Sequence, residues 1–189
     1  MAQRKLLLDS CVYLRIAQSI HPLLGEEFGE DRICLYVISE FEGEYKRSQR
    51  LKTKFPWVAE EKYAQNRKQC IILSRRQRAA LPQATGYFED FAFDHDLTPS
   101  PVDLCALAHA YLAGVELVTD DEDLASLGRE LEVDIWGCLE LLDLMVKKKR
   151  ISLEDAWGAC DYMEYLPDMP RGFYEKRDAF FRSRPENSG

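Results

Sequence analysis

The sequence predicts an α/β fold in which helices cover both faces of a short parallel sheet. Apolar runs of strand length alternate with segments of helical periodicity along the 189 residues. The strand candidates are continuously apolar, which is typical of parallel strands buried on both faces. The composition is 46% hydrophobic and 31% charged, as in one ordinary globular domain. We also expect extra helices in an insertion (46–93) and at the C-terminus.

The first two strands are predicted from apolar runs near the N-terminus. Arg4–Leu8 ends in three leucines before a turn signal, and apolar residues then recur at helical spacing until Pro22. Ile33–Ile38 is β-branched and of strand length. Ser39 followed by Glu42 has the spacing of a capping box, so we expect a helix to begin there.

The middle of the chain is predicted to be helical. The basic stretch 46–78 shows no strand-like alternation and is broken at Pro56, which predicts two helices. Thr85–Phe93 is interpreted as a short aromatic segment. The strongest helix begins at Pro101, and its apolar stripe ends at Gly114.

The last third repeats the strand–helix alternation. The further expected elements are strands at Val115–Val118 and Val133–Trp136, and helices at Glu122–Leu131, Gly137–Lys149, Ser152–Tyr165 and around Phe173–Phe181. The domain organisation that follows is one domain over residues 1–150, including the basic insertion 46–78, a helical extension at 151–181 and a flexible tail at 182–189.

Several classes of protein are not expected from this sequence. No apolar run approaches the roughly 18 residues of a membrane span, and Asp9 interrupts the N-terminal leucines too early for a secretory signal. The six cysteines form no CxxC pair, which favours reduced thiols and a cytoplasmic protein. With three histidines, no HExxH motif and no paired Cys/His spacing, a zinc site is not expected.

The charge of the chain is unevenly distributed. The net charge is −8, yet residues 46–78 hold eleven basic residues against two acidic ones. This segment therefore carries +9 and the remainder −17. Such segregation is compatible with a local site for a polyanion on a surface that otherwise repels it.

Carboxylates follow the predicted strands. Asp9, Glu40 and Asp121 come after three of them, and Asp103 lies at the start of the strongest helix. Ligands of open parallel sheets bind outside the carboxyl ends of the strands, where these acids would converge. Converging carboxylates repel unless a cation neutralises them, and Mg²⁺ or Mn²⁺ prefers oxygen ligands. Beside a basic segment, such an ion suggests phosphodiester hydrolysis.

Each acid also has an ordinary explanation as part of a helix start. Asp9 and Asp121 can cap the helices that follow them. Asp103 fits a Ser100-x-x-Asp103 capping box, and Glu40 suits the first turn of a helix. Position alone does not separate these two interpretations for any single acid.

Four motifs resemble those of PIN-domain nucleases, in the same order. They are LLLDSCV at 6–12, ISEFEG at 38–43, SPVDLCALA at 100–108 and VTDDEDL at 118–124. The resemblance covers residues 4–136. It implies a three-layer α/β/α PIN-like fold, and residues 1–150 would then be the nuclease domain.

The resemblance also implies an activity and its residues. The metal acids of the family correspond to Asp9, Glu40, Asp103 and Asp121, with Asp123 as a further candidate ligand. Thr119 would be a supporting hydroxyl. The family's activity is Mg²⁺- or Mn²⁺-dependent cleavage of single-stranded RNA, often as the toxin of a toxin–antitoxin pair. An antitoxin and a second copy of the chain are therefore candidate partners, although this chain is longer than compact PIN toxins.

The basic insertion supplies the candidate RNA contacts. We expect two clusters of side chains to contact phosphates: Lys46, Arg47 and Arg50, and Arg75, Arg76 and Arg78. The alternative is that these charges only solvate exposed helices.

Two other functions compete with the nuclease. A non-catalytic PIN-like module that binds RNA or protein would have little reason to keep four mutually repelling carboxylates. A haloacid-dehalogenase-like phosphatase needs a second Asp two residues after the first, where this chain has Cys11.

Overall fold

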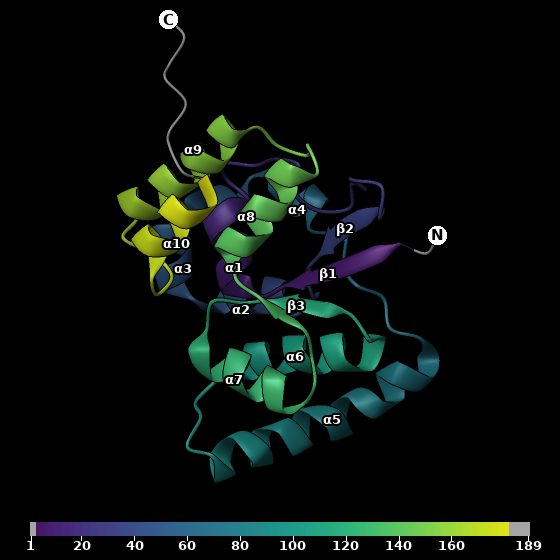
Figure 1. Cartoon of the computed structure of the whole chain (residues 1–189). Helices are drawn as coiled ribbons and strands as arrows, with labels where there is room; N and C mark the ends of the chain where they lie inside the picture. Colours follow the sequence, from purple (N-terminus) through teal and green to yellow (C-terminus); the bar gives the residue numbers. More distant parts are fainter. Residues whose placement is uncertain (1–2, 182–189) are drawn as a thin grey trace, which may run out of the picture.

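A computed structural model describes residues 3–181 of the chain (Figure 1). The predicted flexible tail at 182–189 lies outside the described residues. Within the described part, no helix is both long and apolar enough to cross a membrane.

The centre of the fold is a parallel sheet with the strand order β2-β1-β3-β4. Its strands are β1 (Arg4–Leu8), β2 (Ile33–Tyr36), β3 (Glu116–Val118) and β4 (Ile135–Trp136). All four correspond to predicted strands, and the predicted α/β class with three layers is confirmed. Because β1 pairs with both β2 and β3, the loops that follow these three strands are neighbours at one edge.

Helices cover both faces of the sheet, as Figure 1 shows. On one side lie α5 (Arg75–Asp94), α6 (Pro101–Ala113) and α7 (Glu122–Glu130). The helices on the other side are α1 (Ser10–Ile16), α8 (Cys138–Lys147), α9 (Leu153–Tyr165) and α10 (Phe173–Phe181). The insertion that follows β2 forms α2 (Phe41–Arg47), α3 (Gln49–Lys54), the 3-10 turn η1 (Pro56–Ala59) and α4 (Glu61–Asn66).

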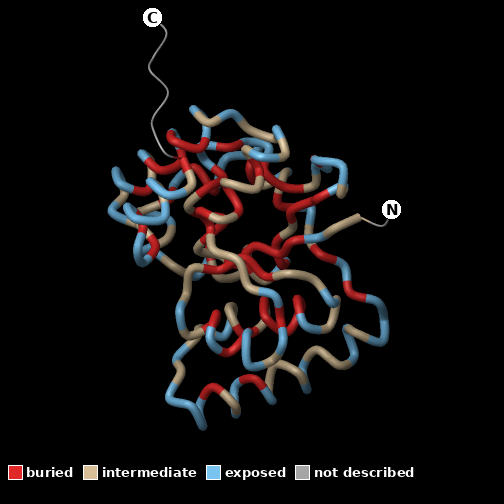
Figure 2. The backbone as a smooth tube through the Cα atoms, viewed as in Figure 1, coloured by how far each residue is buried: buried red, intermediate tan, exposed pale blue. Residues whose placement is uncertain are grey.

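Two hydrophobic cores result, one on each face of the sheet. Leu6 and Leu8 of β1 point into the core shared with α1, α8 and α9, whereas Leu7 points into the core beneath α6. All three leucines are buried. Figure 2 shows buried segments in the interior of the fold and exposed segments on its outside. Because β1 is buried on both faces of the sheet, its sequence is a continuous apolar run.

The insertion differs from its prediction in two places. Residues 46–78 form several short helical segments instead of two helices, and Pro56 begins η1. Thr85–Phe93 is no separate aromatic segment, because it belongs to the twenty-residue helix α5. That helix begins with a Ser74 capping box, and Phe88 and Ala92 are buried on the core side beside α6.

The predicted capping box at Ser39 is wrong. Helix α2 follows Glu40, and no side chain caps it. The Glu42 carboxylate instead accepts a hydrogen bond from Arg67 Nε at 2.6 Å. A buried guanidinium needs a compensating charge more than the exposed start of a short helix needs a cap.

Arg67 connects the insertion to the core. Its side chain is buried and also donates to the Tyr13 hydroxyl at 3.2 Å and the Val58 carbonyl at 2.9 Å. Its guanidinium carbon lies 5.4 Å from the centre of the Phe41 ring. This member of the basic segment therefore serves the packing of the fold and contributes little to a surface charge.

We expect Arg67→Ala to lower the free energy of unfolding by about 3 kcal/mol, since it leaves buried acceptors without their donor. The neighbouring Lys68 is exposed. Lys68→Ala removes the same charge and should change the stability by less than about 0.5 kcal/mol. Urea unfolding followed by circular dichroism measures both. Equal effects of the two variants would contradict a structural role for Arg67.

Candidate functional site

Three of the four predicted acids lie together at the carboxyl edge of the sheet. Asp9 follows β1 directly, Asp121 lies just beyond β3, and Asp103 is in the first turn of α6. Burial is the main cause of the raised pKa of Asp9 and of Asp103; the charge of Asp103 adds to the first and the charge of Asp121 adds to the second. Asp103 therefore lies near both of the other carboxylates.

Asp9 is the most deeply buried acid of the group, with 1% of its surface exposed. One carboxylate oxygen accepts the Val12 N–H at 2.7 Å and thereby caps α1. The other accepts the hydroxyl of Thr119, and the Cys11 thiol lies 3.0 to 3.1 Å from both oxygens. Burial raises the pKa of Asp9 to about 7, against the lowering effect of these hydrogen bonds.

Thr119 links Asp9 to Asp121. It is buried at the end of β3, donates its hydroxyl proton to Asp9 and accepts the backbone N–H of Asp121 at 3.1 Å. Asp121 in turn caps α7, because its Oδ1 accepts the Leu124 N–H at 2.7 Å. One hydroxyl therefore sets the geometry of the loops after both central strands.

Asp103 occupies the capping box of α6. The Ser100 N–H donates to Asp103 Oδ2 at 3.1 Å, and Ser100 Oγ accepts the Asp103 N–H at 3.2 Å. Burial is the main cause of its raised pKa, followed by the charge of Asp121. The capping interpretation thus holds for Asp9, Asp103 and Asp121.

Capping does not use all the acceptor capacity of these carboxylates. An ionised carboxylate offers about four lone-pair sites. The backbone N–H groups bond to one oxygen of each carboxylate. Within the described part of the chain, the other oxygen, Oδ2 of Asp121 and Oδ1 of Asp103, accepts no hydrogen bond from a backbone N–H. Oxygen ligands of this kind fit a hard divalent cation.

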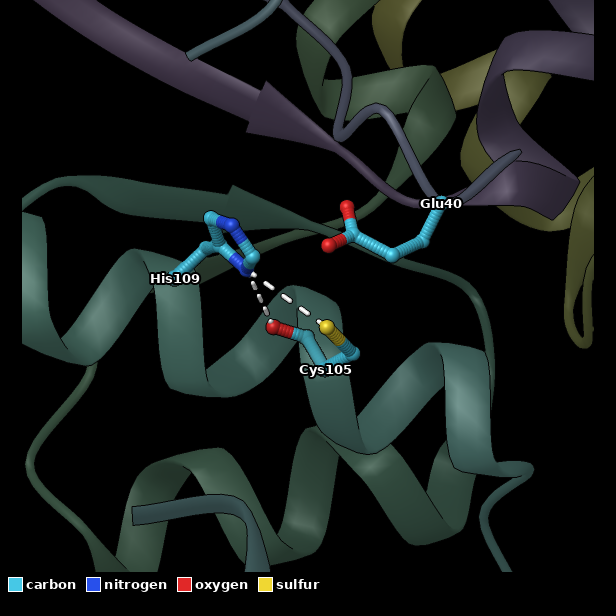
Figure 3. A group of neighbouring side chains, drawn as sticks. All are labelled: Glu40, Cys105 and His109. Carbon is cyan, nitrogen blue, oxygen red and sulfur yellow. Dashed lines mark hydrogen bonds between the residues drawn. The ribbon is translucent and has the colours of Figure 1, made fainter. Parts of the chain in front are cut away.

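The fourth predicted acid, Glu40, lies against different partners. Figure 3 shows its carboxylate facing the thiol of Cys105 and the ring of His109, both on α6. One ligand atom from each of these three side chains lies within 4.8 Å of the others. Among residues 3–181, no set of three that includes Asp9, Asp103 or Asp121 meets this distance.

Cys105 and His109 are held in place by their own helix. His109 Nδ1 lies 2.8 Å from the Cys105 carbonyl oxygen and 3.7 Å from the Cys105 sulfur. Burial and the Glu40 carboxylate raise the pKa of the Cys105 thiol to about 11. Sequence analysis missed this cluster, although the four-residue spacing from Cys105 to His109 places both on one face of a helix.

Asp123 has a separate, structural role. Its Oδ2 accepts the backbone N–H of Thr98 at 2.8 Å and the Thr98 hydroxyl at 3.0 Å. These bonds fasten the loop before α6 to the start of α7. The carboxylate that reaches the buried region beside Asp9 is Asp120, which accepts from Arg15 at 2.7 Å and from the Cys138 N–H at 3.0 Å.

The two predicted basic clusters lie in different places. Lys46, Arg47 and Arg50 are exposed at the junction of α2 and α3, one short helix away from Glu40. Arg75, Arg76 and Arg78 are also exposed, but Gln77 between them donates to the Leu112 carbonyl at the far end of α6. Leu112 is nine residues beyond Asp103, or about 14 Å along the helix.

A cavity of about 510 Å³ opens beside Asp121. Its charged lining residues are the acids Asp120, Asp121, Glu122 and Glu140 and the bases Arg129, Arg171 and Lys176. Arg171 pairs with Glu122 at 2.8 Å across its rim. A larger cavity of about 700 Å³ lies at the opposite edge of the sheet, against Arg4, Glu116 and Asp134, and contains none of the predicted acids.

No family model and no curated protein matches the chain. One solved structure, FitAcB from Neisseria gonorrhoeae, is similar with a TM-score of 0.44 and 13% sequence identity. The match covers 70% of this chain and 97% of that chain. At this level the similarity assigns neither a family nor a function.

The raised pKa of Asp9 makes a prediction about stability and pH. The folded protein holds this proton up to about pH 7, whereas the ordinary value is 3.8. Metal-free protein should therefore lose stability as the pH rises from about 4 to about 7, by up to about 1.4 kcal/mol per pH unit from this group. Asp9→Asn stays neutral, so its stability relative to the parent should increase over the same interval.

Urea unfolding at several pH values, in the presence of EDTA, measures this difference. Other carboxylates contribute equally to parent and variant, so the comparison isolates Asp9. Parallel stability curves for the two proteins would mean that Asp9 has the same pKa in the folded and unfolded states, and would contradict the raised value.

Proposed function

We propose that the protein is a Mg²⁺- or Mn²⁺-dependent endoribonuclease that hydrolyses single-stranded RNA. The observation that carries this proposal is the group of mutually repelling acids Asp9, Asp103 and Asp121 at the carboxyl edge of the sheet. Burying like charges is unfavourable, and a bound cation would offset that cost. The resemblance of the four motifs to PIN-domain nucleases points to the same residues.

The donor chemistry of the group fits the proposed ion. All three side chains offer carboxylate oxygens, the ligands that Mg²⁺ and Mn²⁺ prefer. Asp103 and Asp121 would hold the ion together with Asp9, and Glu40 is a candidate on the same edge. When bound, the ion would polarise a phosphate oxygen and lower the pKa of a water molecule.

Neighbouring residues hold the acid side chains in the orientations that this chemistry needs. Thr119 orients the Asp9 carboxylate and the Asp121 backbone at once. The Val12 and Ser100 backbone donors restrict the Asp9 and Asp103 side chains to one rotamer each. Asp9 would release its proton on binding a cation, so the affinity for metal should rise with pH toward neutrality.

The cavity beside Asp121 is a suitable place for the RNA strand. Its basic side chains, Arg129, Arg171 and Lys176, would contact phosphates. Four acids line the same cavity, so a bound cation would be needed to offset their charge. Because the chain carries −8 overall, binding of RNA needs such local positive charge. A toxin role, an antitoxin partner and a homodimer stay predictions from the resemblance.

A second candidate function has a specific observation in its favour. Asp9, Asp103 and Asp121 each cap a helix, and this would hold in a PIN-like module that binds RNA or protein without cutting it. The two functions differ in what happens when only the negative charge of one acid is removed.

For the nuclease, we expect Asp121→Asn and Asp9→Asn each to abolish RNA cleavage in Mg²⁺ or Mn²⁺, because each loses a metal-binding charge. Asp134, which is exposed at the opposite edge of the sheet, offers a matched control in Asp134→Asn. Gel analysis of a fluorescent single-stranded RNA, with EDTA as the blank, measures cleavage. Folded acid variants with full activity, or a parent protein that binds RNA without cleaving it, would favour the non-catalytic module.

The two basic clusters provide a further comparison, since each carries three positive charges. Replacing Lys46, Arg47 and Arg50 together with Ala should weaken RNA binding and flatten its salt dependence, by a slope of about 0.7 per lost phosphate contact. Replacing Arg75, Arg76 and Arg78 should change the slope much less, because that cluster lies at the far end of α6. Fluorescence anisotropy at several salt concentrations measures both. Equal slopes for the two variants would contradict the preference for the first cluster, and slopes equal to that of the parent would mean that neither cluster contacts the strand.

A further inference from the structure

Three different ligand atoms lie close together on Glu40, Cys105 and His109. A carboxylate oxygen, a thiol sulfur and an imidazole nitrogen all lie within 4.8 Å of one another (Figure 3). The ligands of a tetrahedral ion with bonds of about 2.0 to 2.3 Å are themselves about 3 to 4 Å apart. Side-chain rotations that shorten these distances and turn the free nitrogen of the His109 ring toward the other two ligands would place all three on one ion.

The scaffold for two of these ligands is rigid. Cys105 and His109 are four residues apart on α6, the spacing at which two helical side chains can share a metal. The helix is fixed at its start by the Ser100 capping box and at its end by Gly114, which has a φ of 64°. These two ligands therefore lie on a well-packed helix, whereas Glu40 comes from the turn before α2.

His109 already has the hydrogen bond that a metal-binding histidine commonly makes. The carbonyl oxygen of Cys105 can only accept, so the ring nitrogen beside it, Nδ1, carries the proton. The other nitrogen of the neutral ring, Nε2, then keeps its lone pair and is the metal-binding atom, whereas the protonated Nδ1 that lies 3.7 Å from the Cys105 sulfur is not. Bonds of this kind to a backbone carbonyl orient the ring and increase the basicity of the ligand.

We propose that Glu40, Cys105 and His109 form a binding site for Zn²⁺ or a divalent ion of similar softness. Sulfur, nitrogen and oxygen ligands together are typical of zinc, whereas Mg²⁺ binds neither thiolates nor such a mixed set. The thiol proton passes to solvent as the metal–sulfur bond forms. Three protein ligands leave one position for water, as in catalytic or exchangeable zinc sites.

Glu40 is also a candidate ligand of the acid group, so metal binding at this site would affect activity. This inference rests on the proposed function. Glu40 cannot be a ligand at the acid group and at this site at the same time. An ion bound to Cys105 and His109 would hold the Glu40 carboxylate on α6. Zinc would then compete with the use of Glu40 in a magnesium-dependent reaction.

The experiment uses the full chain without RNA, so its outcome does not depend on nuclease activity. Co²⁺ serves as the spectroscopic probe, because a thiolate ligand produces a charge-transfer band in the near ultraviolet. Zn²⁺ is then added to displace it. We expect this band in the parent protein, its loss on addition of Zn²⁺, and no displacement by an equal concentration of Mg²⁺.

The variants test each ligand against a matched control. Cys105→Ser should remove the band and weaken Zn²⁺ binding by at least about 100-fold, the upper end of the loss when even an outer hydrogen-bond partner of a metal site is removed. Glu40→Gln should keep the band but weaken binding. Cys160→Ser alters a buried cysteine of α9, on the other face of the sheet, and should bind as the parent does.

His95 is the corresponding control for His109. Its Nδ1 is also 2.8 Å from a carbonyl four residues earlier, that of Phe91, but among the described residues it belongs to no group of three possible metal ligands. His109→Asn should weaken binding and His95→Asn should not. Circular dichroism of each variant establishes that it is folded. Absence of the band in the parent, or equal Zn²⁺ affinity of the parent and folded Cys105→Ser, would overturn the proposal.

Discussion

The hydrogen bond from the Thr119 hydroxyl to the buried Asp9 carboxylate is the interaction on which the edge of the sheet depends. It joins the ends of the two central strands, and the same hydroxyl accepts the Asp121 N–H. The orientation of α1 and α7 follows, because Asp9 and Asp121 cap these helices. A carboxylate in this position needs donors to stay buried, and those donors fix the backbone around it.

Capping and metal binding are compatible uses of the same acids. A cap occupies one lone pair of an oxygen and leaves others available. It also restricts the rotamer, which is the preorganisation that a metal site needs. Burial of both Asp9 and Asp103 distinguishes this edge from exposed helix starts, because it raises the pKa of each, and the charge of the neighbouring acid adds to the effect.

The basic insertion combines two physical roles. Arg67 is buried and holds α4 against α2 and the core, with Glu42 as its counter-charge. The exposed members, such as Lys46 and Arg50, have no such partner requirement and remain at the surface. The +9 charge of the segment therefore overstates the positive potential that an RNA strand would meet.

Local signals along the chain were sufficient to predict the strands, most helices and the edge of the sheet at which Asp9, Asp103 and Asp121 lie. Double burial makes β1 continuously apolar, and the Ser100–Pro101 start and Gly114 end of α6 are local signals. Only tertiary structure decided where Glu42 and Glu40 point, since the first meets Arg67 from 25 residues away and the second faces α6. Spacing along the chain gives no information about such distant partners, because they are brought together only when the core packs.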